Sequence, residues 1–224
     1  MVKDMKEQPY NVWLCADPHI LHKGILKHQP QRIKALGLKD EEDIETHYKK
    51  FIEIWHNRVK RGDHVYLLGD VIFNNKQNSV KILHELKSKG AKLHLVVGNH
   101  DDSIKKLDNL FESIELIKVV DFKSSQFKFI EEETFPCVMC HYPMLSWPRK
   151  AHGAIHIHGH THDNSPWENE GDDLRLNVGF DTPFANFDLV NLKQVYQWYK
   201  TKIGDLTPEE YIEKVSKENP KFIR

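Results

Sequence analysis

Apolar runs alternate with amphipathic stretches in the first half of the chain. Short apolar runs at 12–16, 64–68 and 92–97 are typical of buried strands. Between them, apolar residues recur at helical spacing over about 40–59, with Asp40 as the predicted N-cap, and over 78–89, which predicts two amphipathic helices. Strands that alternate with helices favour a mainly parallel sheet.

The pattern changes in the second half, where apolar runs follow one another closely. Runs at Ile114–Phe122, Gln126–Glu131 and Phe135–Cys140 predict an antiparallel meander. Further strands are expected at 154–158, 174–179 and 187–190, and helices near 103–111, at 192–202 and after the capping box of Thr207 and Glu210. Because no segment resembles a linker or a repeat, we expect one domain over 1–224, with a core at 10–203 and a C-terminal helix at about 207–218.

Composition excludes little but points to an ordinary globular protein. The chain has 224 residues, 39% hydrophobic and 29% charged, and its formal net charge is −1. This balance gives no support to bulk binding of nucleic acid or of a membrane surface. No apolar stretch approaches the ~20 residues that cross a bilayer, and the N-terminus lacks the apolar core of a signal peptide. We therefore expect a cytoplasmic protein.

The three cysteines do not suggest a disulfide framework. Cys137 and Cys140 form a C-x-x-C pair, a spacing that also occurs in redox and zinc sites. Here the pair lies within an apolar run, without a second C-x-x-C or a redox βαβ context. We interpret these residues and Cys15 as buried, reduced thiols.

Fifteen histidines are the first sign of metal chemistry. Fragments rich in metal-binding residue types directly follow predicted strands, and they are Asp17-Pro18-His19, Gly69-Asp70, Gly98-Asn99-His100-Asp101, His141 and Gly159-His160-Thr161-His162. Any one of them alone is more often a helix cap or an ordinary loop or core histidine. Together, along one rim of a sheet, they predict a shared metal site.

These fragments resemble, in order and separation, the five signature blocks of the calcineurin-like metallophosphoesterase superfamily. The resemblance covers residues 12–162, and the short interval from His19 to His28 is similar to that of compact bacterial and phage members. It implies an α/β fold, a four-layer α/β/β/α sandwich with two mixed sheets and a binuclear metal site at the carboxyl ends of the strands. It assigns one metal ion to Asp17, His19, Asp70 and His162, and the other to Asp70, Asn99, His141 and His160.

The resemblance also implies a mechanism. Two divalent ions would provide a metal-bridging hydroxide as nucleophile and would offset the charge that develops on the phosphoryl oxygens. His100 would protonate the leaving oxygen, and Asp101 would hold the His100 ring in one tautomer. Because the ligand set contains no thiolate, we expect manganese, with iron, zinc or cobalt as alternatives.

Two further segments offer candidate substrate contacts. The irregular, basic segment 20–39, expected to be a loop with a short helical turn, follows the first ligand block, and loops in that position often carry binding residues. Its candidates are His22, Lys23, His28 and Arg32. After His141, Trp147 could stack on a base and Arg149 could contact a phosphate.

The expected partner is a phosphate-ester substrate, for which several readings remain open. A phosphodiester of the nucleotide or nucleic-acid-end type is favoured, because His100 can assist a poor alkoxide leaving group. A phosphomonoesterase or a nucleotide pyrophosphatase is the enzymatic alternative. A non-catalytic metal-binding scaffold is the alternative from another class. A protein-phosphatase reading loses support, since Val71-Ile72-Phe73 rather than a second acidic residue follows Gly69-Asp70.

Overall fold

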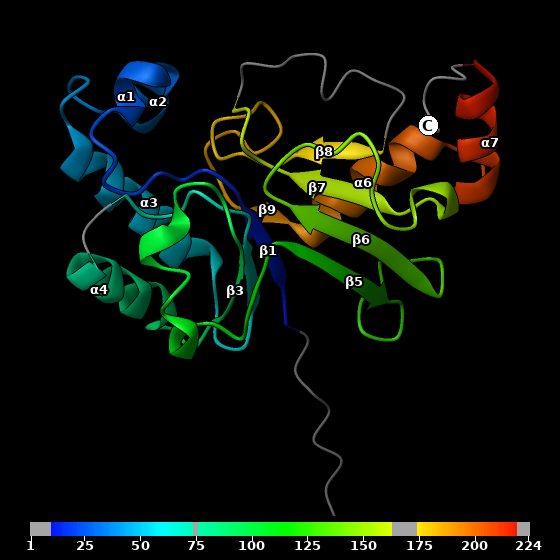
Figure 1. Ribbon diagram of the computed structural model, residues 1–224, viewed down its shortest axis with the longest axis horizontal. Helices are drawn as coiled ribbons and strands as arrows, with labels where there is room; N and C mark the ends of the chain where they lie inside the picture. Colours follow the sequence, from blue (N-terminus) through cyan, green and yellow to red (C-terminus); the bar gives the residue numbers. More distant parts are fainter. Residues whose placement is uncertain (1–9, 74–75, 163–173, 219–224) are drawn as a thin grey trace, which may run out of the picture.

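The first half of the chain supplies four strands of a five-stranded sheet in the computed structural model, which describes residues 10–73, 76–162 and 174–218 (Figure 1). The fifth strand comes from residues 190–191. Its strand order is β4-β3-β2-β1-β9. The strands are β1 (Val12–Cys15), β2 (His64–Leu67), β3 (Lys92–Val96), β4 (Ser113–Glu115) and β9 (Val190–Asn191). β1 to β4 run parallel and β9 is antiparallel to β1, so this sheet is mixed, with a parallel centre as predicted.

A second, four-stranded sheet has the order β5-β6-β7-β8. It contains β5 (Ile117–Lys123), β6 (Thr134–Cys140), β7 (Ile155–His158) and β8 (Arg175–Asn177). β5 is antiparallel to β6, whereas β6, β7 and β8 run parallel. The chain passes from one sheet to the other at Leu116, so the single strand predicted at Ile114–Phe122 is in fact two.

Two other predictions for this region are wrong. The run Gln126–Glu131 forms turns instead of a strand: the N–H groups of Phe127 and Ile130 donate to carbonyls three or four residues earlier rather than to a neighbouring strand. The side chains of Phe127 and Ile130 are buried all the same, which explains the apolar pattern. The helix expected near 103–111 is replaced by two short 3₁₀ turns, η1 (Asp101–Ser103) and η2 (Asp108–Leu110). A third, η3 (Lys150–His152), precedes β7.

Helices lie on both sides of the pair of sheets (Figure 1). On one side are α1 (Ile25–His28), α2 (Gln31–Leu36), α3 (Ile44–Arg58) and α4 (Lys76–Lys87), and on the other are α6 (Leu192–Ile203) and α7 (Pro208–Glu218). α3 begins after Asp43 rather than after Asp40. The predicted α/β fold with two mixed sheets is confirmed.

Alternate residues of the central strands feed two separate cores. Val12 and Leu14 of β1 pack in a core that also contains Phe135 and Ile157 of the second sheet. Cys15, which follows Leu14 and faces the other side of the sheet, packs in a core shared with α1 to α4, and Trp13 packs against the same core. A strand buried on both faces is apolar throughout, which explains the continuous apolar runs of the sequence.

The described part of the chain contains no helix long and apolar enough to cross a membrane. All three cysteines are free and buried. Burial raises the pKa of Cys15, Cys137 and Cys140, so these thiols resist ionisation. The interpretation of buried, unpaired thiols is confirmed.

Candidate metal centre

The loops after the strands of both sheets converge on one region. The backbone N–H of Asp17 donates to Gly69 at 3.0 Å, which joins the loops after β1 and β2. In the second sheet, the N–H of Gly159 donates to His141 at 3.0 Å. A parallel bridge between Ala16 and Gly179 joins the two sets of loops. The predicted ligand fragments are therefore neighbours in space as well as successors of strands.

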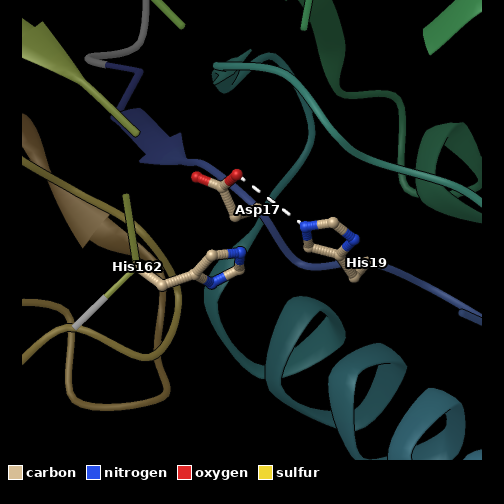
Figure 2. Close-up of side chains that lie close together, drawn as sticks. All are labelled: Asp17, His19 and His162. Atoms are coloured by element: carbon tan, nitrogen blue, oxygen red, sulfur yellow. Dashed lines mark ion pairs between the residues drawn. The ribbon is translucent and has the colours of Figure 1, made fainter. Parts of the chain in front are cut away.

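Asp17, His19 and His162 form one possible ligand group (Figure 2). One nitrogen or oxygen atom from each lies within 4.8 Å of the others. The Nε2 atom of His19 is 3.8 Å from Asp17 Oδ1 and 3.8 Å from Asp70 Oδ2. Asp17 and His19 come from the end of β1 and His162 follows β7, so this group joins the two sheets.

A second group contains Asp17, Asp70 and His141. His141 Nε2 is 3.7 Å from Asp70 Oδ1, 3.1 Å from Asn99 Oδ1 and 3.2 Å from His160 Nδ1. Asn99 and His160 are exposed, whereas His141 is buried. This side of the centre therefore opens to solvent.

The residues present fit divalent metal ions. Asp17 Oδ1 and His19 Nε2 are buried and have no hydrogen-bond partner among the described residues, a costly state for polar atoms unless an ion satisfies them. Two ligand atoms bound to one ion at about 2.1 Å lie roughly 3–4 Å apart, as these atoms do. Burial raises the pKa of Asp17 to about 6 and lowers that of His19, which keeps the imidazole in its neutral, ligating form.

The backbone of these loops is unusual. Five of the seven predicted ligand residues have a positive φ: Asp17 (54°), His19 (49°), Asp70 (52°), His160 (72°) and His162 (52°). Such left-handed conformations cost of order 1–3 kcal/mol each in residues other than glycine, and they persist where the surrounding structure fixes them. Two glycines allow the loops to approach closely, since a Cβ on Gly98 would collide with Asp70 and one on Gly159 with Asp17.

A buried network supports His162, and sequence reasoning did not identify it. Asp181 accepts a hydrogen bond from His162 Nδ1 at 2.9 Å, which leaves Nε2 as the nitrogen available to a metal. Arg32 donates to the same carboxylate, with its Nη2 atom 2.6 Å from Asp181 Oδ2. The guanidinium also donates to the carbonyls of Asp17 and Pro18, so it fixes the first ligand loop as well.

This network corrects one prediction. Arg32, expected to contact the substrate, has a side chain that is 0% exposed, and its donors are directed at protein acceptors. It is a structural residue that joins Asp181 to the backbone of the Asp17 loop. Its position in the basic segment suggested a surface role, whereas its partner lies 149 residues further along the chain.

The expected role of Asp101 also needs correction. Its carboxylate is fully buried and accepts backbone N–H groups from Asp70, Val71 and Gly98 at 2.8–3.0 Å. Instead of orienting the His100 ring, Asp101 therefore holds the loop of Asp70 against that of Gly98.

His100 lies at the solvent-exposed side of the metal centre. Its side chain is 48% exposed, and its Nε2 atom is 3.9 Å from Asp70 Oδ2, on the side of His19. Phe73 contacts it, with ring centroids 4.5 Å apart, and is itself stacked on His22 at 4.0 Å. His22, predicted as a substrate contact, has its ring centroid 5.2 Å from that of His19 and shares the neighbour Phe73 with His100.

The remaining candidates are scattered. Lys23 and His28 are exposed, and His28 lies beside His22 across Gly24. Trp147 is 5% exposed, and its indole N–H donates to Ala154 within the core, so it is not available for base stacking. Arg149 pairs with Asp121 of β5, which gives no support to a phosphate contact.

Comparison with known proteins supports the resemblance. The calcineurin-like phosphoesterase superfamily domain matches residues 45–185. The Gene 66 protein of Mycobacterium phage L5 is 23% identical over 193 residues, which cover 76% of this chain and 86% of that protein. The uncharacterized protein MJ1445 of Methanocaldococcus jannaschii is 28% identical over 154 residues, covering 68% and 70%. The crystal structure of a protein of unknown function, AQ665 from Aquifex aeolicus, has the same fold, with a TM-score of 0.59, 18% identity and coverage of 84% and 98%.

The family match spans more than half of the chain and includes four of the five ligand fragments. The chain therefore belongs to the calcineurin-like phosphoesterase superfamily. It is a metal-dependent phosphoesterase, whose substrates are phosphate esters and whose cofactors are divalent metal ions.

Proposed function

We propose that this protein is a binuclear-metal phosphodiesterase that acts on nucleotides or nucleic-acid ends. The observation that carries the proposal is the position of Asp70, whose Oδ2 faces His19 at 3.8 Å and whose Oδ1 faces His141 at 3.7 Å. A carboxylate with one oxygen toward each ligand group is suited to bridge two ions. Such a pair supplies an activated water and positive charge for the phosphoryl oxygens. The nitrogen and oxygen donors favour manganese, with iron, zinc or cobalt as alternatives.

In this proposal, His100 is the general acid. Its exposed ring can reach a bound substrate while it remains 3.9 Å from Asp70 Oδ2. Proton donation to the leaving oxygen matters most for a poor alkoxide leaving group. A general acid is therefore of most use with a phosphodiester, whose leaving group is an alkoxide, and of less use with an activated monoester.

His22 and His28 are proposed to contact the substrate near its leaving group. His22 is partly exposed, and it reaches the His100 region through their shared neighbour Phe73. His28, which is exposed and adjacent to His22, can extend the same surface. Both have donors suited to phosphate oxygens.

Metal analysis combined with turnover of bis-p-nitrophenyl phosphate and p-nitrophenyl phosphate tests this function. We expect two metal ions per chain and faster hydrolysis of the diester in the presence of manganese. Faster hydrolysis of the monoester would favour a phosphomonoesterase. Retention of both ions without turnover of either ester, or of a nucleoside triphosphate, would favour a metal-binding scaffold.

A further inference from the structure

Exposed large apolar side chains gather in one region of the described structure. They belong to the crossing between the sheets, to β5 and to the loop after β6, and they are Leu116, Ile117, Val119, Tyr142 and Leu145. β5 and β6 are hydrogen-bonded neighbours, with Ile117 paired to Cys140 just before the ligand His141. Contiguous exposed apolar side chains often mark a binding surface, whereas apolar residues scattered singly over a surface do not.

Tyr142 connects this region to the metal centre. Its ring centroid lies 5.0 Å from that of His141 and 4.8 Å from that of His160, with interplanar angles of 75° and 65°. The side chain is nevertheless 43% exposed. An aromatic ring that touches two predicted ligands and still faces solvent is placed to touch a bound substrate.

Hydrogen bonds to the buried His156 hold the loop that carries Tyr142 in place. The N–H of Met144 donates to Nε2 of His156 at 3.1 Å, and Nδ1 of the same imidazole donates to the carbonyl of Val138 at 3.1 Å. His156 is 0% exposed and its ring lies 5.3 Å from that of Trp147. The Tyr142 ring therefore projects from an anchored loop, which reduces the ordering cost of a contact.

Tyr142 and His100 lie on different sides of Asp70. His100 approaches Oδ2, the oxygen that faces His19, whereas Tyr142 packs against His141, which faces Oδ1. The ester groups of a diester diverge from the tetrahedral phosphorus, so they cannot both occupy the His100 side. If the leaving group lies at His100, the retained group must point elsewhere.

We propose that Tyr142 binds the retained substituent of the diester and selects substrates in which that substituent carries a flat aromatic ring, such as a nucleoside. This inference rests on the proposed phosphodiesterase function. The Tyr142 ring would stack on the base, and the interaction would be tolerant of base identity because every base has an aromatic face. Tyr142 is thus a specificity-determining residue, separate from the predicted acid.

A matched pair of substrates isolates this contact. Thymidine 5′-(p-nitrophenyl phosphate) and methyl p-nitrophenyl phosphate share a leaving group and differ only in the retained group. We expect wild type to prefer the thymidine ester, and Tyr142→Ala to reduce this preference about tenfold, within the range measured for loss of one base stack. Tyr142→Phe, which keeps the ring, should retain the preference. Ser146→Ala, which changes an exposed residue of the same loop outside this apolar group, is the control and should match wild type.

Binding provides a second readout that does not depend on turnover. Calorimetric titration with phenylphosphonate and methylphosphonate should show that Tyr142→Ala weakens binding of the phenyl compound and leaves binding of the methyl compound unchanged, at unchanged metal content. Equal kinetic preference in wild type and Tyr142→Ala, or equal loss for both esters, would overturn the inference and leave the phosphodiesterase proposal intact. If wild type hydrolyses neither ester, the phosphodiesterase proposal fails, and the two phosphonates alone decide whether Tyr142 forms an aromatic subsite.

Discussion

Asp181 holds the imidazole of His162 and the guanidinium of Arg32 at the same time, at 2.9 Å and 2.6 Å. The carboxylate and the guanidinium are both 0% exposed. One buried ion pair therefore sets the ring orientation of a predicted ligand and the path of the Asp17 loop.

The first prediction concerns this pair. Asp181→Asn should weaken metal binding roughly 10–100-fold, as loss of a hydrogen-bond partner of a metal-ligating histidine usually does. The free energy of unfolding of the metal-free protein should also fall by about 3 kcal/mol, because Arg32 stays buried without its counter-charge. Equilibrium dialysis and urea unfolding measure the two effects.

The matched control is the exposed pair of Arg58 and Asp188, whose side chains are 51% and 31% exposed. Asp188→Asn should change stability by less than ~1 kcal/mol and leave metal affinity unaltered. Unchanged metal affinity in Asp181→Asn would show that His162 does not need this partner.

The second prediction tests the bridge. Asp70→Asn should lose more metal and more activity than Asp17→Asn, because the oxygens of Asp70 face both ligand groups. Metal content by mass spectrometry, together with turnover, gives the comparison. Two retained ions and near-normal turnover in Asp70→Asn would contradict the assignment.

A third prediction separates an acid from a ligand. His100→Asn should keep both ions and lower the rate by roughly 10²–10⁴-fold, the usual contribution of general acid catalysis. The loss should be larger for diesters with poor alkoxide leaving groups than for p-nitrophenyl esters, which leave without a proton. Equal losses on both kinds of substrate would indicate that His100 only positions the phosphoryl group.

The fourth prediction concerns pH and stability. Burial lowers the pKa of His94 to about 4, and its ring nitrogens lie 2.9 Å from His64 Nδ1 and 3.0 Å from Ser113 Oγ. The unfolded chain, with a histidine pKa of about 6.5, binds more protons between these two values, so native stability should fall as pH decreases from about 6.5 to 4.

His94 alone should contribute about 2–3 kcal/mol of this loss. Urea unfolding of the metal-free protein across this range measures it, and His94→Gln should reduce the slope. An identical pH dependence in the variant would mean that other groups, not His94, control acid stability.

The ligand fragments were predictable because each signal is local. An apolar strand followed at once by Asp, His or Asn fixes both the residue type and its place at a sheet edge, as at Asp17 and Asp70. The parallel sheet then brings such ends together without further information. The same reasoning identified the two longer helices of the first half, α3 and α4, to within a few residues. The segment 20–39, expected to be a loop with a short helical turn, instead contains the two short helices α1 and α2.

The supporting residues were not predictable, since their partners are remote in sequence. Nothing near Arg32 indicates Asp181, and nothing near Asp101 indicates that its carboxylate is occupied by three backbone N–H groups. The division of Ile114–Phe122 between two sheets was missed because apolar alternation continues through Leu116, where the chain changes sheets. Such features depend on tertiary packing, which the hydrophobic periodicity of the sequence does not reveal.

Each possible ligand group draws on both sheets, with Asp17 from the first and His141 or His162 from the second. A bound metal ion would therefore link the two sheets of the sandwich. The segment up to β4 carries Asp17, His19 and Asp70, but neither ligand group is complete without His141 or His162, which come after β6 and β7. Metal binding should therefore require the second sheet, and a chain that ends before β6 should not bind metal at this centre.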